Sequence, residues 1–334
     1  MVNVAIRGEG VAACCCANLL VKAGCRINQE HAQRARLPAV MLSDNALKLI
    51  RDVFGRSDLF HDALRIRRRV VAWGPGAKAL VLEHSAAVVS EQSVLESLGF
   101  EIASGPPEAA ADWTIFASRP LPPAAIEHRF GTRLAFAGPV ELKAAADSET
   151  CWIESLENGW LFLIPGPNGS GSLIAVGAPA DSLLSQSRVV AQQVAQLSAP
   201  ASEFPAYPRI MSPLCGPGWL SCGSAAMAFD PLCGDGTAHA VREAILASAV
   251  IRASAKEPSD DQLFAHYEAR LTAGFRRHLL LCQQYYKSGG IGEWWTSELA
   301  ALERGVEWCD HRLRPAANFQ YRLDGFELSR IHPA

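Results

Sequence analysis

Hydrophobic and polar positions at the start of the chain predict a strand, a helix and a second strand. Residues 2–6 are a short apolar run with β-branched side chains. Gly8 and Gly10 interrupt this run, and residues 11–23 are then rich in Ala, Cys and Leu, as in a helix with small residues on its first turns. Residues 25–29 form a second, weaker strand candidate. This order is that of a parallel βαβ unit.

Helices and strands interleave along the rest of the chain. Ser43 and Asp44 are candidate caps for a helix that ends near Phe54. The other expected helices cover residues 90–98, 181–197, 237–254, 259–285 and 293–310. The expected strands are 70–73 and 79–82, which form a hairpin around Gly-Pro-Gly, then 113–117, 133–136, 150–155, 160–164 and 173–176. The pattern therefore predicts an α/β fold with an antiparallel sheet in its middle.

Composition narrows the class of protein. The chain of 334 residues is long enough for one large domain or two joined ones, and 49% hydrophobic with 19% charged residues is a folded composition. A net charge of −3 offers no basic field, so we expect no nucleic-acid partner. The basic run at residues 65–69 is short, and we interpret it as a solvated strand or helix edge.

Cysteines and apolar segments bear on location. The ten cysteines are scattered and show no CxxC spacing, so we expect reduced thiols and no metal. Residues 14–16 are three consecutive cysteines, which we interpret as small hydrophobic side chains of the first helix. The apolar stretch 11–21 is shorter than the roughly 20 residues that span a bilayer. It also lacks a cationic leader, so we expect a cytoplasmic protein without a membrane partner.

The N-terminal glycine turn has the form GxGxxA, with Gly8, Gly10 and Ala13 at its fixed positions. The first glycine permits the tight turn, the second lets a pyrophosphate approach the backbone, and the small third residue lets helix and strand pack closely. Glu30 follows Gly10 by twenty residues, where an acid accepts hydrogen bonds from an adenosine ribose. We expect a dinucleotide site here, with Arg36 as a candidate partner of the pyrophosphate.

A second glycine-rich segment follows two-thirds along the chain. Gly223 and Ser224 come after a short strand, and residues 229–237 read Phe-Asp-Pro-Leu-Cys-Gly-Asp-Gly-Thr before an Ala-rich helix. Glycines at such a helix start present N–H groups to an anion or a carbonyl. Residues 160–165, Trp-Leu-Phe-Leu-Ile-Pro, form an apolar strand in between.

These segments resemble the flavin-dependent monooxygenases and halogenases. The DPLxGxG loop is similar to that of geranylgeranyl reductases and halogenases. Residues 160–165 are similar to the halogenase WxWxIP signature, with Phe162 in place of the second Trp. The resemblance implies a Rossmann-like FAD-binding domain of the glutathione-reductase type with an inserted antiparallel-sheet substrate domain and C-terminal helices. It also implies that flavin contacts come from Gly223, Ser224, Asp230, Pro231, Gly234, Gly236 and Thr237.

The same resemblance implies domain boundaries. The FAD-binding domain would be discontinuous, the substrate-side β-sheet domain would be inserted into it, and a helical region would follow. The corresponding ranges are 1–60, 95–125 and 205–255 for the FAD-binding domain, 61–94 and 126–204 for the sheet domain, and 256–334 for the helical region.

Three departures from the family argue against halogenation. Ser224 stands where the family usually has an aspartate that holds the ribityl chain. Asp235 brings a carboxylate to the place where halogenases bind a halide, and would repel chloride. Lys78 is the nearest lysine to the region of the halogenase catalytic lysine, and its neighbours do not match.

The expected activity is therefore that of an FAD-dependent oxidoreductase, a monooxygenase that transfers oxygen from a flavin C4a-hydroperoxide to an aromatic or electron-rich substrate. Such chemistry needs positioning and exclusion of water rather than a nucleophile. Asp235 and His239 are the candidates for an acid or base. NADH, NADPH or a partner reductase would supply electrons. The substrate would be a small molecule or a peptide, including a protein tryptophan in quinone-cofactor maturation.

Two alternatives stay open on the sequence. One is an FAD-dependent reductase or dehydrogenase similar to the geranylgeranyl reductases, which would reduce its substrate without oxygen. The other is a non-catalytic protein with a degenerate flavin site, for which Ser224 and the weak second strand are the grounds.

Overall fold

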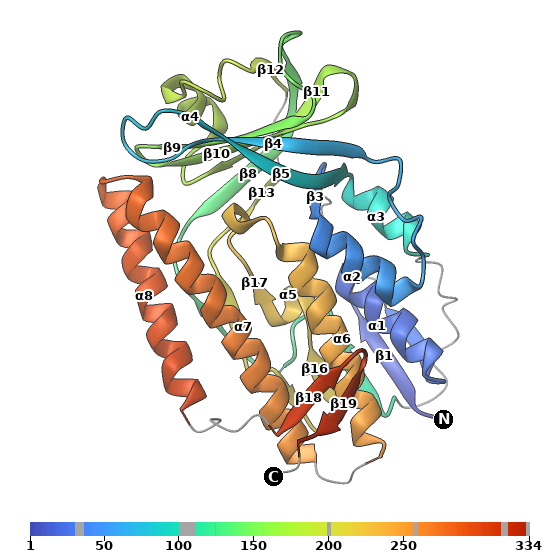
Figure 1. Cartoon of the computed structure of the whole chain (residues 1–334). Coiled ribbons are helices and arrows are strands. Elements are labelled where there is room, and N and C mark those ends of the chain that lie inside the picture. The colour runs from blue at the N-terminus through green and yellow to red at the C-terminus, as the bar shows by residue number, and fades with distance from the viewer. Residues whose placement is uncertain are drawn as a thin grey trace.

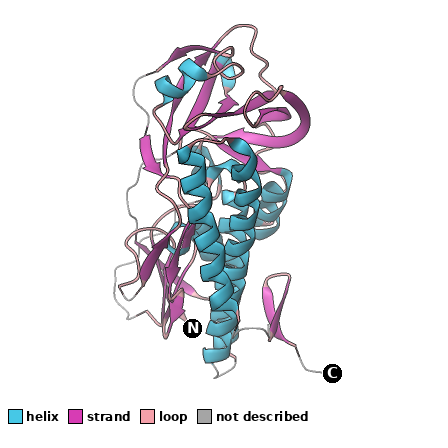
Figure 2. Cartoon of the chain, turned by 90° about the vertical axis from the view of Figure 1, so that its left-hand side faces the viewer, coloured by secondary structure: helices cyan, strands magenta, loops and turns pink. Residues whose placement is uncertain are grey.

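Two large sheets, two smaller sheets and a long helical hairpin make up the described part of the structure (Figure 1). A computed structural model describes residues 1–30, 37–99, 111–123, 125–198, 202–256, 260–314 and 320–331. The larger sheet lies at one end of the molecule, the parallel sheet at the other, and the hairpin runs along both (Figure 2).

The parallel sheet contains the N-terminal strands. Its order is β15-β16-β6-β1-β2, with β1 at Asn3–Arg7, β2 at Arg26–Glu30, β6 at Trp113–Phe116, β15 at Cys215–Gly216 and β16 at Trp219–Ser221. β1 pairs in parallel with both β2 and β6, and Arg7 stands opposite Glu30. The predicted βαβ unit is therefore confirmed.

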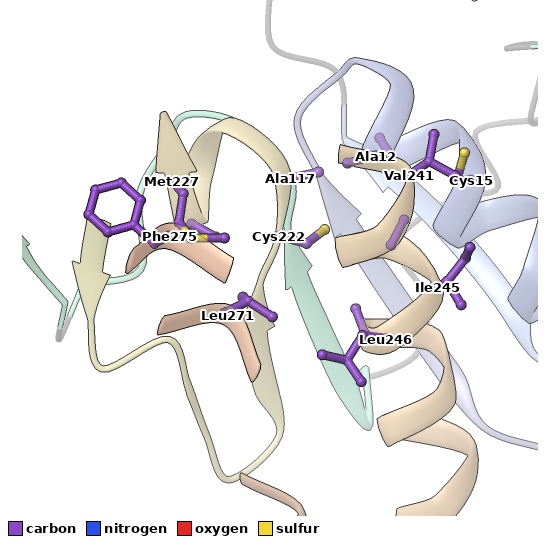
Figure 3. Close-up of a cluster of buried hydrophobic side chains, with 14 of the residues drawn as sticks. Ala12, Cys15, Ala117, Cys222, Met227, Val241, Ile245, Leu246, Leu271 and Phe275 are labelled. Atoms are coloured by element: carbon purple, nitrogen blue, oxygen red, sulfur yellow. The ribbon is translucent and has the colours of Figure 1, made fainter. Parts of the chain in front are cut away.

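Helices α1 (Val11–Lys22) and α6 (Gly236–Ser254) pack against each other over one face of this sheet (Figure 1). Their contact is made by small and apolar side chains, among which Ala12, Val241 and Ile245 lie together (Figure 3). Cys14, Cys15 and Cys16 are all buried there, which confirms their role as small hydrophobic residues. Each fully buried Leu or Ile in such a core contributes about 1.5–3 kcal/mol.

Helix α2 (Asp44–Phe54) begins and ends as the sequence predicts. The Ser43 hydroxyl accepts a hydrogen bond from the backbone N–H of Ala46 at 3.2 Å. Gly55 ends the helix with φ of 66°, a left-handed conformation that glycine adopts without strain. A serine N-cap of this kind contributes about 1 kcal/mol.

The larger sheet has nine strands in the order β12-β8-β11-β10-β9-β4-β5-β3, with β13 also paired to β8. The strands are β3 (Val40–Ser43), β4 (Leu64–Ala72), β5 (Leu80–Val89), β8 (Leu134–Leu142), β9 (Thr150–Leu156), β10 (Gly159–Pro165), β11 (Ser170–Val176), β12 (Val194–Leu197) and β13 (Ser202–Pro205). All pairs are antiparallel except β4 with β9. The predicted hairpin around Gly-Pro-Gly and the antiparallel middle are confirmed.

Smaller elements complete the chain. The predicted helix at 90–98 is confirmed as α3. Helix α3 covers Glu91–Ser97. The other small elements are α5 (Gly223–Ala226), β7 (Ile126–Arg129), β14 (Arg209–Ser212), β17 (Met227–Ala228), β18 (Tyr321–Asp324) and β19 (Glu327–Arg330). The β18–β19 hairpin was not expected from the sequence, because its strands are short and mostly exposed.

The helix predicted over residues 181–197 is wrong in its second half. Helix α4 covers only Ala180–Gln186, and β12 begins at Val194. The reason is Glu154 on β9, which is 5% exposed. Its carboxylate accepts the backbone N–H groups of Arg188, Val189 and Val190 at 2.8–3.1 Å. These N–H groups are then no longer available to a continuing helix.

Helices α7 (Asp260–Gly289) and α8 (Glu293–Leu313) confirm the two predicted C-terminal helices and lie side by side (Figures 1 and 2). Two tryptophans join them to the larger sheet: the indole N–H of Trp295 donates to the Leu156 carbonyl at 2.9 Å, and that of Trp160 to the Tyr286 hydroxyl at 3.2 Å. Among the described residues, no helix combines the length and the apolar character that a membrane span requires.

Candidate functional site

The N-terminal turn (residues 8–10) joins β1 to α1. Gly8 and Gly10 have φ of 103° and 115°, a region that side chains rarely adopt. A Cβ built on Gly8 would lie 2.1 Å from the Ser118 hydroxyl, so only glycine fits this position. No side chain of the described residues caps α1 at Gly10. The first N–H groups of α1 are therefore free to bind an anion.

The Gly223 turn (residues 222–226) meets the N-terminal turn at the end of β6. A Cβ on Gly223 would lie 2.8 Å from the Ala12 side chain and 2.9 Å from the Ala117 carbonyl oxygen. Ala12, Ala117 and Cys222 accordingly lie next to one another (Figure 3). Ser118 completes the contact, because its hydroxyl accepts the backbone N–H of Glu9 at 3.0 Å. Two glycine turns that are more than 200 residues apart in sequence thus lie together at the carboxyl ends of the neighbouring strands β1, β6 and β16.

Glu30 ends β2 beside the N-terminal turn, where its carboxylate pairs with Arg7 at 3.1 Å and is half exposed. Its backbone oxygen accepts the N–H of Gly8 at 2.9 Å. The neighbouring Gln29 is buried, and its Oε1 has no hydrogen-bond partner among the described residues. An unpaired buried acceptor beside Gly8 fits a site whose ligand supplies the missing donor. The candidate Arg36 lies outside the described residues.

The Asp230 loop (residues 230–237) leads into α6. The side chain of Asp230 points into the protein: one oxygen accepts the N–H of Leu232 at 2.8 Å, and the other accepts Arg133 Nε at 2.8 Å and the Tyr286 hydroxyl at 2.7 Å. Its backbone N–H donates to His278 Nε2 at 2.9 Å. With both carboxylate oxygens and the N–H engaged, Asp230 fixes the loop, and a ligand contact at this residue would be left to its backbone carbonyl.

The glycines of the Asp230 loop face open space. A Cβ on Gly236 would meet no atom within 4 Å, and one on Gly234 would meet only the Arg69 Nη2 at 3.9 Å. Pro231 and Thr237 are partly exposed on either side. The loop therefore offers a backbone surface, at the start of a helix, that a planar group can approach.

Asp235 and His239 lie one helical turn apart at the start of α6. Asp235 pairs with Arg242 at 3.0 Å, and its carboxylate is 3.9 Å from His239 Nε2. The His239 ring stacks on Phe229 with centroids 4.1 Å apart. Burial lowers the pKa of His239 to about 4, so the ring is neutral at pH 7 and a weak base. Both remain candidates for proton transfer.

The larger sheet contributes Arg69, which the sequence did not single out. Arg67 and Arg68 are exposed, as expected for a solvated edge, but Arg69 is partly buried and turns toward Gly234. Its Nη2 lies 2.9 Å from His84 Nε2, and its guanidinium lies over the Phe162 ring. Burial lowers the pKa of His84 to about 4, and the positive charge of Arg69 adds to this effect. Arg69 Nε is buried, and the Arg69 side chain also lowers the pKa of the Cys151 thiol against the larger effect of burial.

Glu243 on α6 lies beneath the Gly223 turn, and the sequence motifs did not indicate it as a site residue. Its carboxyl accepts the N–H of Gly223 at 2.7 Å and is 5% exposed. Burial raises its pKa to about 8, in spite of the opposing effect of that hydrogen bond. The carboxyl therefore holds its proton at neutral pH, which avoids a buried charge behind the turn.

We predict that Glu243 makes the protein less stable as pH rises. Its pKa is about 8 in the folded protein and about 4.3 when unfolded, so the folded state binds the extra proton between these values. The free energy of unfolding should fall by up to about 1.4 kcal/mol per pH unit from this group, from pH 5 to 8. Glu243→Gln, a neutral acceptor of the same shape, should remove that slope in urea unfolding at several pH values. Glu203→Gln, an exposed control, should retain it; equal slopes in wild type and Glu243→Gln would contradict the assignment.

Two surface cavities lie elsewhere. One, of about 860 Å³, follows the outside of α2 and includes Arg51, Phe60 and Arg65. The other, of about 330 Å³, lies between β9 and the turn from α7 to α8 and includes Glu154, Arg188 and Ile291. Neither is lined by residues of the two turns. The arginines of the first are engaged, with Leu59 and Asp44 among their partners, so size alone does not make it the site.

Comparison with known proteins identifies the fold. No family model and no curated protein matches the sequence. Among solved structures, the flavin-dependent halogenase CmlS matches with a TM-score of 0.75 at 16% identity, over 93% of this chain and 70% of that one. The peptidyl tryptophan dihydroxylase QhpG, essential for tryptophylquinone cofactor biogenesis, matches with a TM-score of 0.69 at 18% identity, over 88% and 78%.

A third match is a variant of Klebsiella pneumoniae HpxO complexed with FAD, with a TM-score of 0.64 at 16% identity, over 93% and 94%. At these identities the matches establish the fold. The chain has the mixed α/β fold, with parallel and antiparallel sheets, of the FAD-dependent halogenases and monooxygenases.

Proposed function

We propose that this protein is an FAD-dependent oxidoreductase of the monooxygenase type. The observation that carries the proposal is the meeting of the N-terminal turn and the Gly223 turn at one edge of the parallel sheet. The carboxyl ends of parallel strands are where nucleotide cofactors bind in α/β folds. The fold shared with flavoenzymes supports the same assignment.

The residues present fit an extended dinucleotide. The N-terminal turn and the start of α1 would bind the pyrophosphate, and Glu30 the adenosine ribose. The Gly223 turn and the backbone of Gly234 and Gly236 would face the ribityl chain and the flavin ring. This arrangement is of the glutathione-reductase type. Bound flavin would supply electron transfer to oxygen, and the chain would supply binding, orientation and exclusion of water.

We assign parts of the chain to separate tasks on the same grounds. Residues 1–60, 95–125 and 205–255 would hold the cofactor, residues 61–94 and 126–204 the substrate, and the C-terminal helices would join the two. Arg69, whose Nη2 lies beside Gly234, would orient a carbonyl or anionic group between sheet and loop. Neutral His84 supports Arg69 from behind.

The substrate class that we favour is aromatic or otherwise electron-rich, as a small molecule or within a peptide. The match to a peptidyl tryptophan dihydroxylase over 88% of this chain favours the peptide version as a second candidate. That version brings a protein substrate as partner. Electrons would come from NADH, NADPH or a partner reductase.

The absorption spectrum of the purified protein tests the proposal. We expect a flavin spectrum that bleaches when NADH, NADPH or a reductase is added without oxygen, and that returns when oxygen is admitted. Reoxidation by substrate in the absence of oxygen would instead indicate a reductase. Protein that is colourless and stays colourless with added FAD would overturn the cofactor assignment.

A further inference from the structure

Two cysteines and a histidine form a cluster next to the Asp230 loop. Cys233 ends the short helical turn Pro231–Cys233, and His278 and Cys282 lie one turn apart on α7. The sulfur of Cys282 is 3.7 Å from that of Cys233 and 3.3 Å from His278 Nε2. The three ligand atoms all lie within 4.8 Å of one another. Neither the glycine motifs nor the proposed flavin chemistry uses this cluster.

The two sulfurs differ in their surroundings. Cys233 is partly exposed, whereas Cys282 is fully buried. Hydrogen bonding from Cys282, reinforced by His278, lowers the pKa of Cys233 to about 6, while burial raises that of Cys282. The lowered pKa of Cys233 and the raised pKa of Cys282 make the partly exposed sulfur the more readily ionised of the two. A thiolate is the nucleophile in thiol oxidation, and a neighbouring thiol is what resolves the product.

A metal ion suits this cluster less well. His278 Nε2 already accepts the backbone N–H of Asp230 at 2.9 Å. The nearby carboxylate of Asp230 is engaged with Arg133, Tyr286 and the N–H of Leu232. A zinc ion would be left with two thiolates, whereas structural zinc sites have four protein ligands.

We propose that Cys233 and Cys282 form a redox-active dithiol that reacts with hydroperoxides. The Cys233 thiolate attacks the O–O bond of ROOH, takes one oxygen to become a sulfenic acid after protonation, and releases ROH. The Cys282 sulfur then attacks that sulfenic sulfur, forms the S–S bond and releases water. The balance is two thiols plus ROOH giving one disulfide, ROH and water. The new bond ties the Asp230 loop to α7.

The molecule contains a matched control pair. The sulfurs of Cys16 and Cys222 are 3.8 Å apart, nearly the same distance as in the reactive pair. Both residues are fully buried, and hydrogen bonding to Cys16, together with burial, raises the pKa of Cys222 well above its ordinary value. Proximity is therefore equal in the two pairs, while access and thiolate character differ. Only the Cys233–Cys282 pair is expected to react.

Peptide mapping of the full chain tests this proposal. Protein treated with hydrogen peroxide is alkylated under denaturing conditions and digested with trypsin. We expect a reducible link between the peptide that contains Cys233 and residues 278–287, and no link to residues 8–22, which contain Cys16. The Cys233–Cys282 pair should oxidise at least about tenfold faster than the Cys16–Cys222 pair, because each pKa unit changes the concentration of thiolate about tenfold.

Single variants identify the order of the steps. Cys282→Ser should stop at a sulfenic acid on Cys233 that dimedone traps, and Cys233→Ser should leave Cys282 reduced. Equal oxidation of both pairs, or a Cys233 that stays reduced, would overturn the proposal. So would stoichiometric zinc in the purified protein that protects Cys233 and Cys282 from alkylation. The readout is the state of the thiols, so its outcome is separate from that of the flavin spectrum.

Discussion

Gly10→Asp is expected to yield a folded protein that no longer binds flavin. Gly10 has φ of 115°, and a side chain there both strains the turn and stands at the start of α1. A carboxylate would occupy the place where the proposed pyrophosphate binds, and like charges in contact cost several kcal/mol. The affinity for FAD should therefore fall by more than about 100-fold. Flavin content after purification and titration of the protein with FAD measure the effect.

Gly24→Asp is the matched control for this experiment. Gly24 follows the other end of α1 with φ of 80°, and a Cβ there would meet no atom within 4 Å. The control introduces the same charge and a comparable backbone strain away from the N-terminal turn. It should keep its flavin, and circular dichroism should show that both variants are folded. Undiminished flavin content in Gly10→Asp would remove the basis of the cofactor assignment.

Arg133→Met is expected to destabilise the protein by about 3–5 kcal/mol, because it leaves buried carboxylates without their counter-ion. Arg133 is 2% exposed and bonds to both Asp230 and Glu298. Its guanidinium also lies 4.7 Å from the centre of the Tyr286 ring. Urea unfolding monitored by tryptophan fluorescence would measure the loss.

Two further variants separate charge from packing. Arg67→Met removes an exposed arginine that pairs with Glu149, and should change the free energy of unfolding by less than about 1 kcal/mol. Adding Glu298→Gln to Arg133→Met removes one of the stranded charges and should recover part of the loss. An Arg133→Met protein with the same free energy of unfolding as the wild type would show that the buried ion network does not stabilise the fold.

Local sequence signals predicted the elements that depend on local rules. The Ser43 cap, the glycine turn at residues 8–10 and the Gly-Pro-Gly hairpin each act over a few residues, and each appears as expected. The helix predicted over residues 187–193 is wrong because the N–H groups of Arg188, Val189 and Val190 bind Glu154, which lies on another element. No pattern within the segment itself reports that distant acceptor.

The same limit applies to the candidate site. The glycine turns are short motifs and were visible in the sequence, but their contact through Ala12 and Ala117 was not. Arg69 sits in a basic run in which Arg67 and Arg68 are exposed and Arg65 is partly buried, and nothing within the run distinguishes it. Glu243 gains its raised pKa from burial, and Cys233 gains its lowered pKa from Cys282 on another element. Burial and long-range pairing, which give these groups their chemistry, exist only in the folded protein.

The anchoring of Asp230 has a consequence for biosynthesis. A ribosome makes Arg133 and Asp230 well before His278, Tyr286 and Glu298. His278 binds the backbone N–H of Asp230, Tyr286 binds its carboxylate, and Glu298 binds Arg133, the arginine that pairs with Asp230. While only the first 255 residues have emerged, the parallel strands and α6 are complete, but the loop in front of α6 lacks three of its supports. Final anchoring of the Asp230 loop would thus await the last two long helices, so their folding is the step that completes this part of the molecule.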